Sequence, residues 1–263
     1  MQTLEGKAVA DRAYWHLTPE IDDARSISEF ALKRLRADIL SARLAPGTKL
    51  LIRFLTSHYQ IGVSPLRDAL AQLAGDGLVI LESQRGFRVA PVSRDDLRDV
   101  ADARKRIELA ALEMSIKRGD DAWRKRVRAA YASFCLVKQK VGDSNPITED
   151  WEQRHRTFHL VLLSACSSPT LLHFCAQLHD RFDRYRRLAL PSRSYMGAIG
   201  DDHEVFMEAA LAGRQEEAIA LLARHIDDTA ALVEEHFQPP ESDTPKRIRG
   251  AARAAPGNAL VAR

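Results

Sequence analysis

The most constraining feature of the chain is the order of helix and strand patterns between residues 62 and 90. Ser64 and Pro65 suit the first positions of a helix, and apolar residues at helical spacing follow them. Gly75 and Gly77 can end that helix. Two short strand-like runs follow at 78–82 and 86–90, so the sequence predicts a helix and then a β-hairpin.

Two further helices are expected before this segment, at residues 26–41 and 52–59, with the breaker Leu-Ala-Pro-Gly between them. Three helices followed by a hairpin form the pattern of a winged helix-turn-helix, whose second paired helix enters the major groove of DNA. Arginine suits this role because its planar fork can hold guanine or phosphate. The alternative is that these are solvated surface side chains. The candidate DNA-binding residues are Arg53, Ser64, Arg67, Gln84, Arg85 and Arg88.

From Ser93 onward the sequence shows no convincing strand pattern, so we expect an all-helical bundle. The predicted helices are 94–117, 120–141, 147–166, 168–189, 199–212 and 214–236. The fold class is therefore mainly α. The expected organisation is a flexible arm at 1–25, a DNA-binding domain at 26–92, a helical ligand- and metal-binding domain at 93–238 and a disordered basic tail at 239–263.

Charge is unevenly spread along the chain. Residues 26–92 hold nine Lys and Arg against five Asp and Glu, a net of +4, whereas the whole chain carries +3. A basic module beside a slightly acidic one fits a nucleic-acid binder coupled to a second function, although surface scatter is the simpler reading. Three cysteines, the lack of a signal-like apolar segment and the lack of a membrane-spanning run predict a soluble, cytoplasmic protein without membrane contact.

Four histidines are placed on the apolar faces of predicted helices. His155 and His159 are four residues apart and share one face, and His203 and His225 lie on two other helices. Imidazole is a common metal ligand, and helical bundles build metal sites from facing helices. The alternative is four core histidines held by hydrogen bonds, and the other histidines of the bundle, His173, His179 and His236, are expected to be structural.

The segment PGTKLLIRFLTSHYQIGVSPLRDALAQLAGDGLVILESQRGFRVAPVS resembles the winged-helix head of GntR-type transcription regulators. The shared features are the Pro-Gly turn, Arg53 with Leu55, PLRDAL, GDGLV and the RGFRV wing. The resemblance implies that Arg53 and Arg67 contact the operator. The family often has an arginine where this chain has Val63, so one base contact is expected to be missing.

The helical half resembles the FCD ligand-binding domain of the FadR branch of the same family, through Arg104 to Glu108, the Phe-His pair at 158–159, His203 and His225. The resemblance implies a divalent metal, zinc or nickel, held by three histidines and an Asp or Asn, with a small carboxylic acid against it. Here the Asp or Asn position is His155, which would ligate in its place or not at all. Arg104 is the candidate effector clamp, with a salt bridge to Glu108 as the alternative.

Within that branch, the WEQRHRTFH run and the IGVSPLRDAL head look most like glutarate-sensing repressors induced by carbon starvation. We therefore expect a homodimeric regulator, a repressor, on a palindromic double-stranded operator, with no enzymatic activity. Two alternatives remain open. One is a metal-dependent enzyme, although Glu204 should point away from His203 and no other base stands out. The other is a DNA-binding regulator whose metal is structural.

Overall fold

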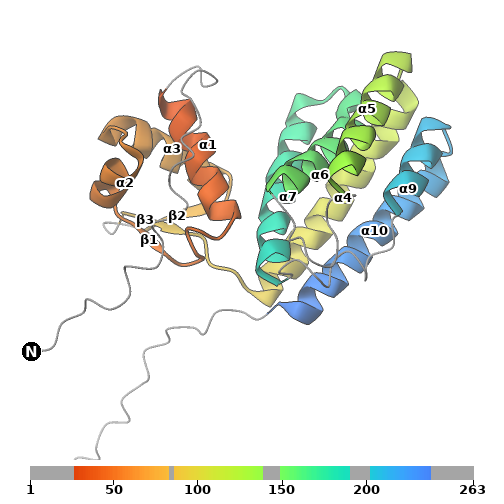
Figure 1. Cartoon of the computed structure of the whole chain (residues 1–263). Coiled ribbons are helices and arrows are strands. Elements are labelled where there is room, and N and C mark those ends of the chain that lie inside the picture. Colours follow the sequence, from red (N-terminus) through yellow and green to blue (C-terminus); the bar gives the residue numbers. More distant parts are fainter. Residues whose placement is uncertain (1–26, 83–85, 139–148, 190–201, 238–263) are drawn as a thin grey trace, which may run out of the picture.

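The N-terminal part of the chain is a winged helix-turn-helix, as predicted. The computed structural model describes residues 27–82, 86–138, 149–189 and 202–237. In this part the elements are α1 (Ile27–Leu40), β1 (Lys49–Leu50), α2 (Ile52–Tyr59), α3 (Val63–Gly75), β2 (Val79–Glu82) and β3 (Gly86–Val89) (Figure 1). Helices α1 and α3 pack against each other over an apolar core that includes Leu35, Leu66 and Leu70.

The wing is a three-stranded antiparallel sheet in the order β1-β3-β2, where the sequence predicted two strands. Strand β1 pairs with β3 through Lys49 and Arg88, and β2 pairs with β3 from Val79 to Glu82. A strand of two residues is too short to show an alternating pattern, so its pairing partner rather than its own sequence creates it. The extra strand ties the turn after α1 to the wing.

The N-cap of the recognition helix α3 lies two residues before the expected one. Gly62, with extended backbone, is the N-cap and has no side chain to cap the helix, and Ser64 lies in the first turn. The first intrahelical donor is the Leu66 N–H, which bonds the Gly62 carbonyl. The first N–H groups of a helix have no intrahelical acceptor, so proline can occupy any position of the first turn. Pro65 therefore does not show which residue begins the helix.

The second part of the chain is a helical domain, and in its described residues we find no strand from Ser93 onward. Its elements are α4 (Arg94–Arg118), α5 (Asp121–Lys138), α6 (Glu149–Leu162), the 3-10 turn η2 (Ser164–Cys166), α7 (Pro169–Ala189), α9 (Asp202–Leu211) and α10 (Gln215–His236) (Figure 1). The Ser93 hydroxyl caps α4 by accepting a bond from the Asp96 N–H at 3.1 Å. The predicted ends at 139–141, 147–148 and 199–201 lie outside the described residues.

The C-terminal end of α10 is fastened to the start of α4. Arg94 donates to the carbonyl oxygens of Glu234 at 3.0 Å and Phe237 at 2.9 Å. Phe237 is fully buried and its ring meets the Tyr185 ring at 5.3 Å. The helical domain therefore includes Phe237, and a truncation meant to spare the fold has to end after this residue.

The two domains are joined by a group of four charged side chains and one amide that we call the interdomain bridge, formed by Arg36, Asp76, Arg156, Gln177 and Asp180. Arg36 on α1 pairs with Asp76 and, at 2.6 Å, with Asp180 on α7. Arg156 on α6 also pairs with Asp180, at 2.5 Å, and Gln177 donates to Asp76 at 2.7 Å. Asp76 is the C-cap of α3, so the end of the recognition helix is bonded to α7.

Among the described residues, no helix combines the length and the apolar composition that crossing a bilayer requires.

Candidate metal centre and nucleic-acid interface

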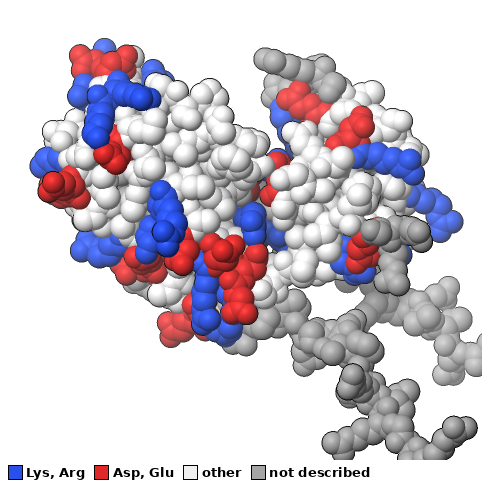
Figure 2. Space-filling model, turned by 180° about the vertical axis from the view of Figure 1, so that it is seen from behind, with Lys and Arg blue, Asp and Glu red and all other residues white. Residues whose placement is uncertain are grey.

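The side chains expected at DNA include three exposed residues on α2 and α3. Arg53 lies in the first turn of α2, and Ser64 and Arg67 lie in the first turns of α3. In Figure 2, Lys and Arg side chains project from the outer edge of the winged-helix domain, away from the helical domain. The first turns of a recognition helix are the part that reaches base edges. Gln84 and Arg85 lie outside the described residues.

Arg88 is held inside the wing. Its Nε donates to the Glu82 carboxylate at 2.7 Å, and a terminal nitrogen donates to the Gly47 carbonyl at 2.5 Å. These bonds join β2, β3 and the turn before β1. The side chain that we expected at DNA thus already stabilises the shape of the wing, and its role at DNA stays a prediction.

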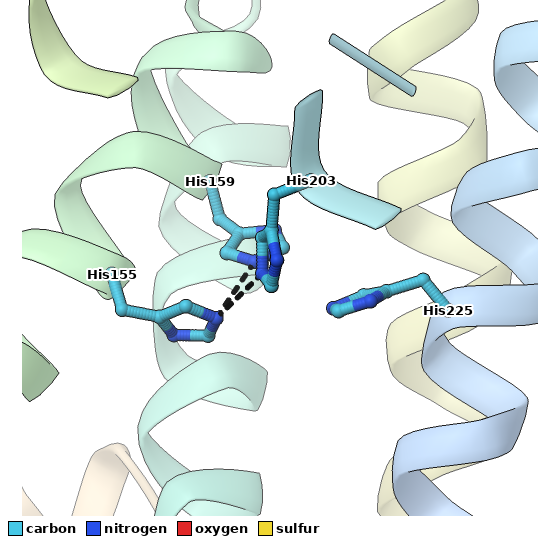
Figure 3. Close-up of side chains that lie close together, drawn as sticks. All are labelled: His155, His159, His203 and His225. Carbon is cyan, nitrogen blue, oxygen red and sulfur yellow. Dashed lines mark hydrogen bonds between the residues drawn. The ribbon is translucent and has the colours of Figure 1, made fainter. Parts of the chain in front are cut away.

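The structure brings the four predicted histidines together at one point inside the helical domain. Figure 3 shows His155 and His159 on α6, His203 on α9 and His225 on α10 turned toward a common centre. One nitrogen from each ring lies within 4.8 Å of the others. The Nε2 atoms of His155 and His159 are 3.1 Å apart, as are those of His155 and His203. We call this group the histidine cluster.

Burial favours the uncharged form of three of the four rings. Burial, together with the neighbouring histidines, holds the pKa of His155, His159 and His225 well below the ordinary value. A neutral imidazole keeps a lone pair on one nitrogen, which is the form that binds metals. The Nδ1 atom of His225 is buried with no hydrogen-bond partner among the described residues. A neutral, all-nitrogen donor set fits a borderline divalent ion such as zinc or nickel and fits Mg²⁺ or Ca²⁺ poorly.

Aromatic rings enclose the cluster. Trp151 stacks on His155 with centroids 4.7 Å apart and an angle of 11° between the planes. Phe134 and Phe206 meet the rings of His155 and His225 at 5.3 Å. These side chains restrict the imidazole rotamers.

A string of buried charges runs from α4 to α7 beside the cluster. Arg104 pairs with Glu108 at 2.7 Å, which is the salt bridge that the sequence offered as its alternative role. The rings of His179 and His159 lie 5.3 Å apart, and His179 lies 3.8 Å from Glu108 and 3.7 Å from Asp183. Burial by itself would raise the pKa of Glu108 and of Asp183, yet the neighbouring cations outweigh it and hold both values low. Both carboxylates are therefore ionised inside the domain.

Arg186 continues this string to the cluster itself. It pairs with Glu152 and, at 2.9 Å, with Asp183, and a terminal nitrogen lies 3.3 Å from Nδ1 of His155. Burial, opposed by Arg186 and reinforced by Asp183, raises the pKa of Glu152 to about 7. Sequence reasoning predicts only a structural role for His179 and does not single out Glu152, Asp183 or Arg186. The available signal was the spacing of 179, 183 and 186, which places three polar residues on one helix face.

Comparison with known proteins agrees with both halves of this description. The model of the bacterial regulatory proteins, gntR family, matches residues 27–89, and that of the FCD domain matches residues 99–228. The uncharacterized HTH-type transcriptional regulator BphR of Paraburkholderia xenovorans is 36% identical over 225 residues, which cover 85% of this chain and 92% of that protein. The chain belongs to the GntR family of transcription regulators, with an FCD domain.

A second relative of this GntR regulator is the HTH-type transcriptional repressor GlaR of Escherichia coli K12. It is 34% identical over 197 residues, which cover 73% of this chain and 89% of that repressor. The regulator also shares its fold with the solved structure of E. coli McbR/YncC, at a TM-score of 0.69 and 18% identity over 81% of this chain and 99% of that one. These relatives are regulators rather than enzymes, and exposed Glu204 offers no base at the histidine cluster.

Proposed function

We propose that this GntR regulator is a homodimeric repressor whose histidine cluster holds one divalent metal, zinc or nickel, and whose effector is a small carboxylic acid. Glutarate or a related dicarboxylate is the effector we propose, because the helix around His155 and the head around Pro65 resemble glutarate-sensing repressors. Acid binding changes the affinity of the dimer for a palindromic operator. A coupling of about 1–3 kcal/mol corresponds to a change of about 5–150-fold.

The observation that carries this proposal is the convergence of four buried imidazoles from α6, α9 and α10. Neutral imidazoles gathered at one point turn lone pairs toward the same place, and one ion there can accept them. The ion would keep its full charge because the rings are neutral. A carboxylate is the ligand that compensates such a charge.

Arg104 supports the proposal that the effector is a carboxylic acid. Its side chain is 3% exposed, and Glu108 takes its Nε and one terminal nitrogen. A guanidinium has five N–H donors, so a second carboxylate can share Arg104 with Glu108. The repressor assignment draws on the similarity to the repressor GlaR. The DNA contacts are assigned to Arg53, Ser64 and Arg67, with Gln84, Arg85 and Arg88 on the wing.

The first experiment measures metal per chain on untagged protein by plasma mass spectrometry. About one zinc or nickel ion per chain is expected, together with a dimer in sedimentation equilibrium. Operator fragments selected from random DNA by the protein then serve in fluorescence anisotropy titrations with glutarate, before and after chelation. Weaker DNA binding with glutarate, only in the metal-loaded protein, is the expected result. An unchanged operator affinity with glutarate and its homologues would make the metal purely structural.

A further inference from the structure

His155 differs from the other members of the cluster in what its second ring nitrogen faces. Arg186 approaches Nδ1 of His155 at 3.3 Å. A guanidinium carries only N–H donors, so Nδ1 has to be the acceptor in this contact. Histidines that bind metals usually do the reverse and donate the second N–H to a carboxylate, a carbonyl or water.

Neither partner in this contact is free to turn away. Arg186 is 2% exposed and is fixed by Glu152 on α6 and Asp183 on α7. Its guanidinium also lies over the Trp151 ring, 5.1 Å from the centroid. The same Trp151 stacks on His155 and fixes the plane of that imidazole. The orientation of both groups is therefore set by side chains around the cluster.

A neutral imidazole carries one proton, so accepting at Nδ1 places that proton on Nε2. This Nε2 is the atom of His155 that lies 3.1 Å from the Nε2 atoms of His159 and His203. A protonated ring nitrogen has no lone pair to give a metal. We propose that His155 presents an N–H donor beside the metal, to the position that a ligand of the metal would occupy, while His159, His203 and His225 alone hold the metal.

The His155 N–H indicates where the effector binds, and this part of the inference rests on the proposed function. Three neutral imidazoles would leave room on a divalent ion for a further ligand, and a carboxylate oxygen bound there could accept a hydrogen bond from the His155 N–H. The family resemblance gives this position to an Asp or Asn of the protein. Here the protein supplies a hydrogen-bond donor instead, so the negative oxygen has to come from the effector. Carboxylic acids are favoured over neutral ligands for this reason.

The test compares two substitutions one turn apart on the same helix, His155→Gln and His159→Gln. X-ray absorption at the zinc edge should count three imidazoles in the wild-type protein and again three in His155→Gln, whereas His159→Gln should lose stoichiometric zinc. Glutarate binding to zinc-loaded His155→Leu, whose side chain has no donor, should weaken about tenfold, as expected for one lost hydrogen bond to a charged group. Four imidazoles in the wild type, with zinc lost from His155→Gln, would refute the three-histidine site and leave the metal proposal intact.

Long-range proton–nitrogen NMR on the metal-free protein tests the tautomer without any substitution. The proton of His155 is expected on Nε2, and a proton on Nδ1 would overturn the inference even if the wild-type protein bound no metal. Failure of the wild type to bind zinc would instead overturn the proposed function.

The role of Arg186 is tested by the paired substitution Arg186→Gln with Glu152→Gln, which removes one buried charge of each sign. The glutamine oxygen can accept from Nδ1–H, so His155 can then present its lone pair to the metal. We expect the imidazole count at zinc to rise from three to four. A count that stays at three would show that Arg186 does not set the tautomer.

Discussion

The interiors of the two domains are built on different chemistry. In the described part of the winged-helix domain, Asp38 and Asp76 are the buried polar side chains, and each is paired with an arginine near the surface. In the helical domain, charged side chains and histidines lie in the middle of the core. Burying such groups is unfavourable unless each is matched, and apolar side chains of similar volume often stabilise as well or better. The comparison teaches that stability alone does not account for the polar interior of the helical domain.

The largest effect is expected from breaking one buried pair of the helical domain. Arg104→Met leaves Glu108, 1% exposed, without its main partner and should lower the free energy of unfolding by about 3–5 kcal/mol in urea titrations. The double substitution Arg104→Met with Glu108→Leu should restore most of that loss. It leaves no unpaired buried charge, and the site becomes apolar like the core of the winged-helix domain.

The matched control lies on the same helix. Lys117 and Glu113 have the same i,i+4 spacing on α4 but are exposed. Lys117→Met should change the free energy of unfolding by less than about 1 kcal/mol. Equal losses for the buried and the exposed variant would contradict the distinction between the two environments.

An apolar truncation in the winged-helix domain should be costly without touching the metal. Leu70 is fully buried between α1 and the rest of its core, and Leu70→Ala should lower the free energy of unfolding by about 2–5 kcal/mol. Metal content per folded chain should stay unchanged. A variant that unfolds as expected but also loses metal from its folded fraction would show that the two interiors are not independent.

Acid should weaken the helical domain through its histidines. The pKa values of His155, His159 and His225 are lowered by folding, so the unfolded chain binds more protons below about pH 6.5. Stability of the metal-free protein is complete above that pH and falls as the pH drops, by about 1.4 kcal/mol per pH unit for each histidine. Glu152 acts in the opposite direction. Folding raises its pKa from 4.5 to about 7, so between these two pH values its protonation adds stability as the pH drops and offsets the loss from one histidine.

Urea titrations of metal-free protein at a series of pH values measure this slope. His173 is exposed, and His173→Gln should leave the slope as it is. His225→Phe should reduce the slope by about one proton. A flat profile between pH 6.5 and 5 would show that the cluster is not neutral and buried in solution.

The smallest effect on the fold is expected at the DNA-binding surface, whose function rests on exposed residues. Arg67→Ala should weaken operator binding by about 1–3 kcal/mol in anisotropy titrations, while the free energy of unfolding changes by less than about 0.5 kcal/mol. Arg126→Ala, an exposed arginine on α5, is the control and should alter neither. Unchanged operator affinity for Arg67→Ala would mean that another helix enters the groove.

Periodicity predicted the elements that bury an apolar face, including the placement of all four histidines toward the core. It missed β1, whose two residues depend on β3 for their conformation, and it placed the start of α3 two residues late because Pro65 is compatible with several first-turn positions. Periodicity could not predict that Arg88 contacts Glu82 and Gly47. Nor could it predict that Arg186 contacts His155, because these contacts join separate segments of the chain. Side-chain partners across elements follow from packing, which local sequence does not encode.

The interdomain bridge has a consequence for distance. On α6, His155 belongs to the histidine cluster and the next residue, Arg156, belongs to the bridge. On α7, His179 lies against His159 and the next residue, Asp180, holds both Arg156 and Arg36. Successive residues on a helix are about 100° apart, so a small rotation of either helix moves both members of such a pair at once. The histidine cluster and the interdomain bridge therefore lie on different sides of the same two helices. Each helix is about 10 Å in diameter, so a rotation of one helix would be enough to couple the two groups.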